Sequence, residues 1–167
     1  MTTLTASAAV FTIALLLIIL SYIAVRGVTS LNLQFLIDTP KPVGEGGGIG
    51  NSIVGSAMMT VLASVIGLPI GIGAGVYLAE LGENWFGKIT RFVADTLIGV
   101  PSIIVGIFVY TLVVLPMGRQ SGLAGSISLA MIMIPIVART TEEMIRLVPQ
   151  PMREAALALG APQWRVT

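Results

Sequence analysis

The sequence contains no cysteine and no histidine, and only 10% of its 167 residues are charged. These absences exclude disulfides, thiol nucleophiles, Cys/His zinc sites and every catalytic triad that needs an imidazole. The net charge of +1 excludes a broad basic surface for nucleic acid. A soluble domain carries about 25% charged residues. With 55% hydrophobic residues instead, the composition predicts a membrane protein whose first partner is the lipid bilayer.

Four long stretches of the chain lack Asp, Glu, Lys and Arg altogether. A helix needs roughly 20 apolar residues to cross a membrane, so the sequence predicts an all-α membrane protein, a polytopic bundle with four spanning helices. The predicted order is a first transmembrane helix (1–25), an external loop (26–49), a second transmembrane helix (50–79), a cytoplasmic loop (80–95), a third transmembrane helix (96–118), an external turn (119–122), a fourth transmembrane helix (123–139) and a cytoplasmic segment (140–167).

Lysine and arginine are distributed unevenly between the two sides of this arrangement. Cytoplasmic loops of membrane proteins carry an excess of these residues. With both termini in the cytoplasm, six of them fall inside and three outside, so we expect cytoplasmic termini. Arg26, directly after the first helix, on its own favours the opposite orientation.

Small residues and prolines distinguish the later helices from plain anchors. Gly67, Gly71 and Gly75 recur every four residues, which predicts a face against which a neighbouring helix packs closely. One proline lies inside each of the second, third and fourth spans, where it removes a backbone hydrogen bond. Such breaks suit a bundle that lines a path or moves, and they are equally consistent with structural kinks. These prolines are Pro69, Pro101 and Pro135.

Residues 82–88 match the first seven positions of a phosphate-binding loop, G-x-x-x-x-G-K. Ile89 stands where a serine or threonine must bind magnesium, and no strand precedes the motif. We interpret the segment as a short loop with Trp85 and Phe86 at the membrane interface. If this chain moves a solute uphill, the energy must therefore come from an ion gradient or from a separate ATP-binding subunit.

Charged residues cluster directly after the fourth span. Arg139 and Glu143 are four residues apart, as are Glu142 and Arg146, so these side chains can pair along one helix face. One interpretation is a solvated helix extension. The other is that Arg139 faces the bundle interior and meets an anionic solute, while a carboxylate holds it between visits. Ser102 offers its hydroxyl either to the same pathway or to its own helix.

The last segment predicts a short helix, a glycine turn and a second helix on the cytoplasmic side. Pro149 and Pro151 break the chain, and apolar residues at i, i+3, i+4 and i+7 follow from Met152. Gly160 is placed to end this helix in a left-handed cap, and Pro162 suits the first turn of the next helix. Small residues on the exposed face let such a helix lie in a groove of another protein.

Within this segment, Glu154, Ala155 and Ala156, followed after three residues by Gly160, resemble the EAA loop of ABC importer permeases. That loop is a cytoplasmic coupling helix that sits in a cleft of the ATP-binding subunit. Further stretches narrow the resemblance to permease subunits of phosphate importers of the PstA type. These stretches are 46–56, 68–80, 99–110 and 138–149. The resemblance implies the MetI-like fold of type I importers, with four of its six helices in this chain.

The resemblance also implies a function and a set of partners. The chain would move inorganic phosphate across the cytoplasmic (inner) membrane of a bacterium or archaeon. It would form a heterodimer with a second permease, contact two copies of an ATP-binding subunit and receive phosphate from a phosphate-binding protein. ATP and magnesium would bind to the ATPase, while this chain would hold no cofactor, hydrolyse nothing and transmit motion through Glu154, Ala155, Ala156 and Gly160.

The sequence departs from the family pattern at two places. It stops at Thr167, within the loop, so we expect two further helices beyond it, and Pro162 replaces the usual threonine or serine. Composition and spacing leave other functions open: a permease for sulfate or molybdate, a membrane anchor without transport activity, or a gradient-driven transporter. The last should show inverted repeats or intramembrane acidic residues, and neither is evident.

Overall fold

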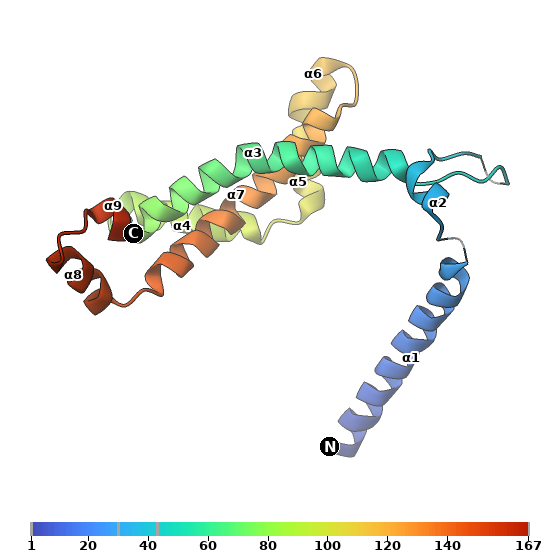
Figure 1. Ribbon diagram of the computed structural model, residues 1–167, viewed down its shortest axis with the longest axis horizontal. Helices are drawn as coiled ribbons and strands as arrows, with labels where there is room; N and C mark the ends of the chain where they lie inside the picture. The colour runs from blue at the N-terminus through green and yellow to red at the C-terminus, as the bar shows by residue number, and fades with distance from the viewer. Residues whose placement is uncertain (1, 30, 43, 167) are drawn as a thin grey trace. The chain divides into compact units, whose positions relative to one another are not determined.

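The computed structural model describes residues 2–29, 31–42 and 44–166, which form helices and the turns and loops between them (Figure 1). The chain divides into two units after Gly55. The helices are α1 (Thr2–Val28), α2 (Leu33–Ile37), α3 (Gly50–Glu80), α4 (Trp85–Ile98), α5 (Ser102–Val109), the π-helix η1 (Tyr110–Val114), α6 (Leu115–Met117), α7 (Gly122–Arg146), α8 (Gln150–Ala158) and α9 (Gln163–Val166).

The first unit contains α1, α2 and the beginning of α3. Helix α1 ends at Val28, three residues beyond the predicted end, and its apolar side chains are exposed, as expected for a helix surrounded by lipid. The predicted loop 26–49 is partly helical, because Asn32 caps α2 by accepting a 2.7 Å hydrogen bond from the Phe35 backbone N–H.

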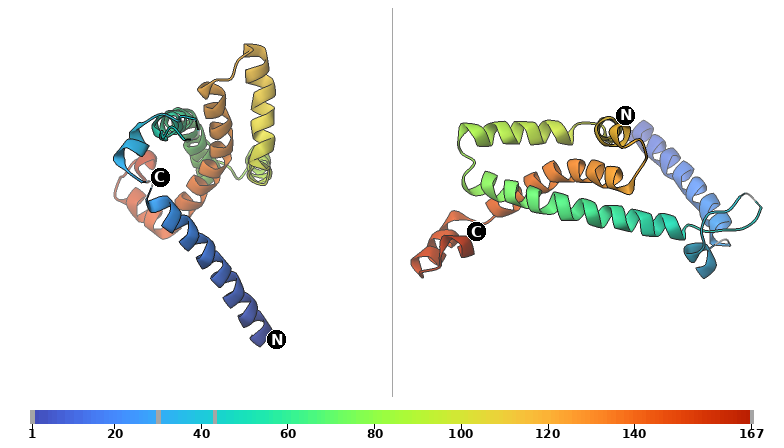
Figure 2. Two further views of the ribbon diagram at one scale, coloured as in Figure 1. Left: turned by 90° about the vertical axis from the view of Figure 1, so that its right-hand side faces the viewer. Right: turned by 90° about the horizontal axis from the view of Figure 1, so that it is seen from above.

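The second unit is built around α7, which lies between α3 and α4 in the right-hand view of Figure 2. Each glycine of the predicted small-residue face of α3 is buried at this contact: Gly67 faces Met133, Gly71 faces Val137 and Gly75 faces Thr141. A Cβ atom on Gly75 would lie 2.5 Å from the Thr141 Cβ and 2.6 Å from the Ala138 carbonyl oxygen. The two backbones therefore approach as closely as they do only because these positions carry no side chain.

The third predicted span differs most from the structure. Residues 85–95, expected as part of a cytoplasmic loop, and 96–98, expected as the start of the third span, together form helix α4. The chain then bends by 100° before α5 begins at Ser102. Pro101 explains the break, because its ring removes a backbone donor and disfavours helical geometry at Val100. A single straight helix over 96–118 is therefore not present in this structure.

The other two intramembrane prolines do not interrupt their helices. Pro69 lies inside α3 and Pro135 inside α7, and both helices continue past them. Helix α7 runs two turns beyond the predicted end at residue 139, which places Glu142 and Arg146 on the same helix as Arg139.

The C-terminal helices follow the predicted order with earlier boundaries. Helix α8 begins at Gln150 rather than near Met152, because Pro151 occupies the first turn, where a proline is tolerated. Gly160 has a φ of 83° and ends the helix. Its N–H donates to the Leu157 carbonyl, and the Ala161 N–H donates to the Ala156 carbonyl, which is the Schellman pattern. Helix α9 then follows Pro162.

Among the described residues, α1, α3 and α7 are long and apolar enough to cross a membrane. The bent pair formed by α4 and the segment 102–117 makes a fourth candidate if it acts as one span.

Candidate functional site

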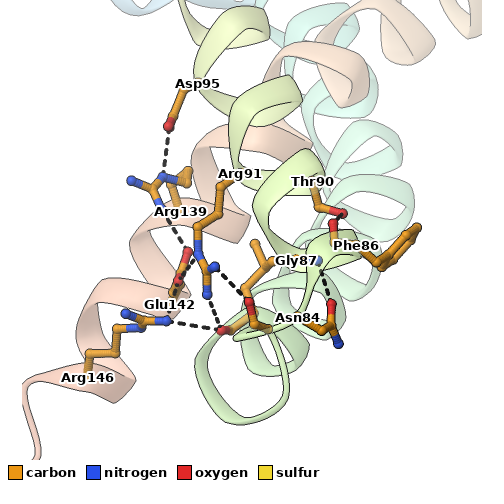
Figure 3. A network of polar contacts seen from close by, with 11 residues as sticks. Asn84, Phe86, Gly87, Thr90, Arg91, Asp95, Arg139, Glu142 and Arg146 are labelled. Carbon is orange, nitrogen blue, oxygen red and sulfur yellow. Dashed lines mark hydrogen bonds and ion pairs between the residues drawn. The ribbon is translucent and has the colours of Figure 1, made fainter.

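The most buried charged side chain described in the second unit is the carboxylate of Glu142, on the last turns of α7, at 2% exposure. It accepts from Arg91 at 2.6 Å, from Arg139 at 2.8 Å and from Arg146 at 3.0 Å (Figure 3). Arg139 also pairs with Asp95 of α4 at 2.8 Å. We call these five residues the Glu142 network. A buried carboxylate is stable only when such partners compensate for its lost hydration.

Arg91 connects the network to the end of α3. Its remaining guanidinium nitrogens donate to the carbonyls of Leu78 and Gly82, each at 2.7 Å. The Leu78 carbonyl is one of the last four of α3, which have no partner within their own helix. Arg91 therefore caps α3 while it holds Glu142, and the Leu78 carbonyl also accepts from Arg146 at 3.3 Å.

The network carries an excess of positive charge, because three arginines share two carboxylates. Arg139 is held from both sides by Asp95 and Glu142, and a quarter of its side chain is exposed. Asp95 is itself more than half exposed, so it is the carboxylate that is easier to displace. A partly exposed guanidinium with one displaceable carboxylate is suited to exchange it for another oxyanion.

The structure confirms one pairing predicted from local spacing, Glu142 with Arg146, and replaces the other. Arg139 pairs with Glu142, three residues away, and not with Glu143, which is exposed and makes no ion pair within the described part of the chain. Ser102 lies at the exposed start of α5 and takes no part in the Glu142 network.

Two members of the network, Arg91 and Asp95, were not predicted as site residues. They lie four residues apart on one face of α4, a segment first interpreted as a loop. The four-residue spacing places Arg91 and Asp95 on one helix face. Their partners lie on α7, far along the sequence, and no local pattern identifies these partners.

The loop that resembles a phosphate-binding motif has a structural explanation. Asn84 caps α4 by accepting a 2.8 Å hydrogen bond from the Gly87 N–H, and its amide donates to the Leu81 carbonyl. Gly82 and Gly87 are buried against each other, so any side chain on Gly87 would clash with the Gly82 backbone. These glycines allow the tight turn between α3 and α4.

Helix α8 presents most of its surface to the outside. Glu154 and Ala155 are exposed, Ala156 is half-buried, and Met152 and Leu159 are 65% and 90% exposed. Small and acidic residues are thus available on a helix that projects from the bundle, which is the geometry of helix-in-groove recognition.

Comparison with known proteins identifies the family. Residues 67–167, which contain the Glu142 network and α8, match the binding-protein-dependent transport system inner membrane component. The chain belongs to this family. Its members are membrane-embedded transport components, which agrees with the apolar helices of both units. No solved structure gives a significant match.

Within the family, the chain is similar to several curated phosphate transport permeases. The chain is 50% identical over 143 residues to the phosphate transport system permease protein PstA of Yersinia pestis, covering 84% of this chain and 48% of the relative. It is 49% identical over 150 residues to PstA of Pasteurella multocida, covering 89% and 53%. PstA of Mycobacterium leprae is 42% identical over 120 residues, covering 71% and 40%. The chain spans about half the length of the curated relatives it matches.

Proposed function

We propose that this chain is part of a permease subunit of an ATP-driven importer that moves inorganic phosphate across the cytoplasmic membrane. The observation that carries the proposal is the 40–50% identity to proteins named as phosphate transport permeases, over most of the chain. The positively charged Glu142 network supports it, because it supplies guanidinium groups of the kind that bind phosphate oxygens.

In this proposal the energy comes from partner subunits. A second permease completes the pathway, two ATP-binding subunits hold ATP and magnesium, and a phosphate-binding protein delivers the substrate. The exposed Glu154 and Ala155, with Ala156 and the cap at Gly160, form the surface of α8 that enters the ATPase cleft. The chain itself performs no hydrolysis, and both termini of the described segment face the cytoplasm.

Arg139 is the residue proposed to meet phosphate. Asp95 and Glu142 hold its guanidinium in place, and an arriving phosphate would replace the more exposed Asp95 carboxylate. Glu142 would keep Arg139 in position because Arg91 and Arg146 also hold that carboxylate.

Uptake of labelled phosphate tests the proposal. The full-length permease is produced with its partner subunits in cells that lack their own importer, and excess sulfate or molybdate is added in parallel. ATP-dependent uptake that neither competitor reduces supports phosphate. Competition by sulfate or molybdate would support an ABC importer but indicate a substrate other than phosphate. No uptake by an assembled complex would favour a non-transporting anchor.

A further inference from the structure

One charged contact lies outside the Glu142 network and joins α8 to the rest of the second unit. The Arg153 guanidinium pairs with the Glu80 carboxylate at 2.5 Å, and its other nitrogen donates to the Ile145 carbonyl at 2.6 Å. Glu80 is the last residue of α3, and Ile145 lies in the last turn of α7. A single side chain of α8 therefore holds the ends of both long helices.

Burial distinguishes this contact from an ordinary surface ion pair. The side chains of Arg153 and Glu80 are 16% and 19% exposed. By contrast, Met152 on the same helix and Leu159 directly after it are largely exposed. Within the described residues, Arg153 makes the only ion pair of α8. The rigid guanidinium fork is what lets one residue hold a carboxylate and a carbonyl together.

We propose that Arg153 is a positioning residue that fixes α8 to the ends of α3 and α7, so that movement of α8 is passed to the helices carrying the Glu142 network. This rests on the proposed function, since it takes α8 to be the helix moved by the ATPase. Glu80 lies two residues after Leu78, whose carbonyl binds Arg91 and Arg146. A displacement at Arg153 thus reaches the network through one turn of α3.

The test uses the full-length permease assembled with its partner subunits in lipid vesicles. The variants are Arg153→Glu, Glu80→Arg and the double exchange that restores the pair with its charges swapped. The matched control is Glu83→Arg, which makes the same charge reversal at an exposed position three residues from Glu80. Two quantities are measured: ATP hydrolysis without phosphate, and phosphate moved per ATP hydrolysed.

Each single variant should lower the phosphate moved per ATP by about 3- to 30-fold, and raise hydrolysis without phosphate at least about threefold. The double exchange should recover most of both losses, while Glu83→Arg should match the wild type. A purely structural role would change the amount of assembled complex and leave the ratio in the surviving complexes unchanged.

Two results would overturn the proposal: single variants with the wild-type ratio, or a double exchange no better than the worse single variant. If charge reversal prevents assembly, Arg153→Lys keeps the charge for the ion pair but lacks the planar fork that also reaches the Ile145 carbonyl, and it should lower the ratio by a smaller factor. An unchanged ratio in Arg153→Lys would likewise count against the proposal. A wild-type complex that hydrolyses ATP but moves no phosphate would refute the proposed function. The role of Arg153 could then still be tested by comparing ATP hydrolysis without phosphate between the variants and the wild type.

Discussion

At the scale of single residues, the central arrangement is one carboxylate shared by three arginines. Two of these arginines lie on α7 with Glu142 itself, and the third, Arg91, comes from α4. Removing the carboxylate would leave three guanidinium groups close together without compensation, which is costly because Arg91 and Arg139 are largely buried. The network therefore stabilises the contact between α4 and α7 and at the same time holds Arg139 in a fixed position.

Replacement of Arg139 tests its proposed role directly. Arg139→Gln removes the charge that would meet phosphate, and a hydrogen bond to a charged group contributes about 1.5–3 kcal/mol. We expect uptake of labelled phosphate to fall by about 10- to 100-fold, while the assembled complex is recovered in normal amount. The matched control is Arg119→Gln, at an exposed position in the turn before α7. Normal phosphate uptake by Arg139→Gln would show that this arginine has only a structural role.

At the scale of helices, α3 packs closely on α7 through its glycine face. The four-residue repeat of glycine predicts this face directly, because close approach depends only on the absence of side chains. The glycine cap of α8 is equally local, and Gly160 has the expected positive φ.

Neither helix α4 nor its contacts with α7 could be predicted from the sequence. Five charged residues in 80–95 suggested a loop, whereas one face of α4 packs on α7. The choice of Glu142 over Glu143 by Arg139 also depends on Arg91, which approaches from a helix 51 residues earlier. Local spacing allowed both pairings, and only the tertiary contact decides between them.

The glycine face gives a graded prediction for stability. Gly75→Ala places a Cβ atom 2.6 Å from a backbone carbonyl, whereas Gly67→Ala meets the flexible Met133 side chain at 3.2 Å. Overpacking typically costs about 1–3 kcal/mol, so Gly75→Ala should lower the unfolding temperature of the purified full-length permease more than Gly67→Ala does.

Gly73→Ala serves as the control for this series, because it lies on the same helix and a Cβ atom there meets nothing within 4 Å. Its unfolding temperature should match or slightly exceed that of the wild type, since alanine favours helix. Equal losses at Gly73 and Gly75 would contradict close packing of α3 on α7.

At the scale of the whole molecule, the bundle places its charged network and its exposed α8 at the same end. The C-terminal ends of α3 and α7 meet there, and Arg91, Arg146 and Arg153 each bind carbonyls or carboxylates at those ends. The exposed α8 and the Glu142 network are thus both held at these helix ends, within one unit.

Charge reversal on α8 tests docking at this scale. Glu154→Lys changes an exposed side chain that makes no ion pair in the described part of the chain, so the fold of the permease should be unaffected. A mismatched charge at an interface typically costs several kcal/mol. We expect the ATP-binding subunit to be lost on purification and phosphate uptake to fall at least about tenfold. Normal co-purification with normal uptake would show that α8 is not the docking helix.

The most direct test of the account is ATP-driven accumulation of labelled phosphate in vesicles containing only the purified full-length permease and its partner subunits. The account predicts accumulation with ATP and the phosphate-binding protein, none with a non-hydrolysable ATP analogue, and a strong loss in Arg139→Gln. Absence of accumulation by a complex that hydrolyses ATP, or accumulation independent of ATP, would contradict it.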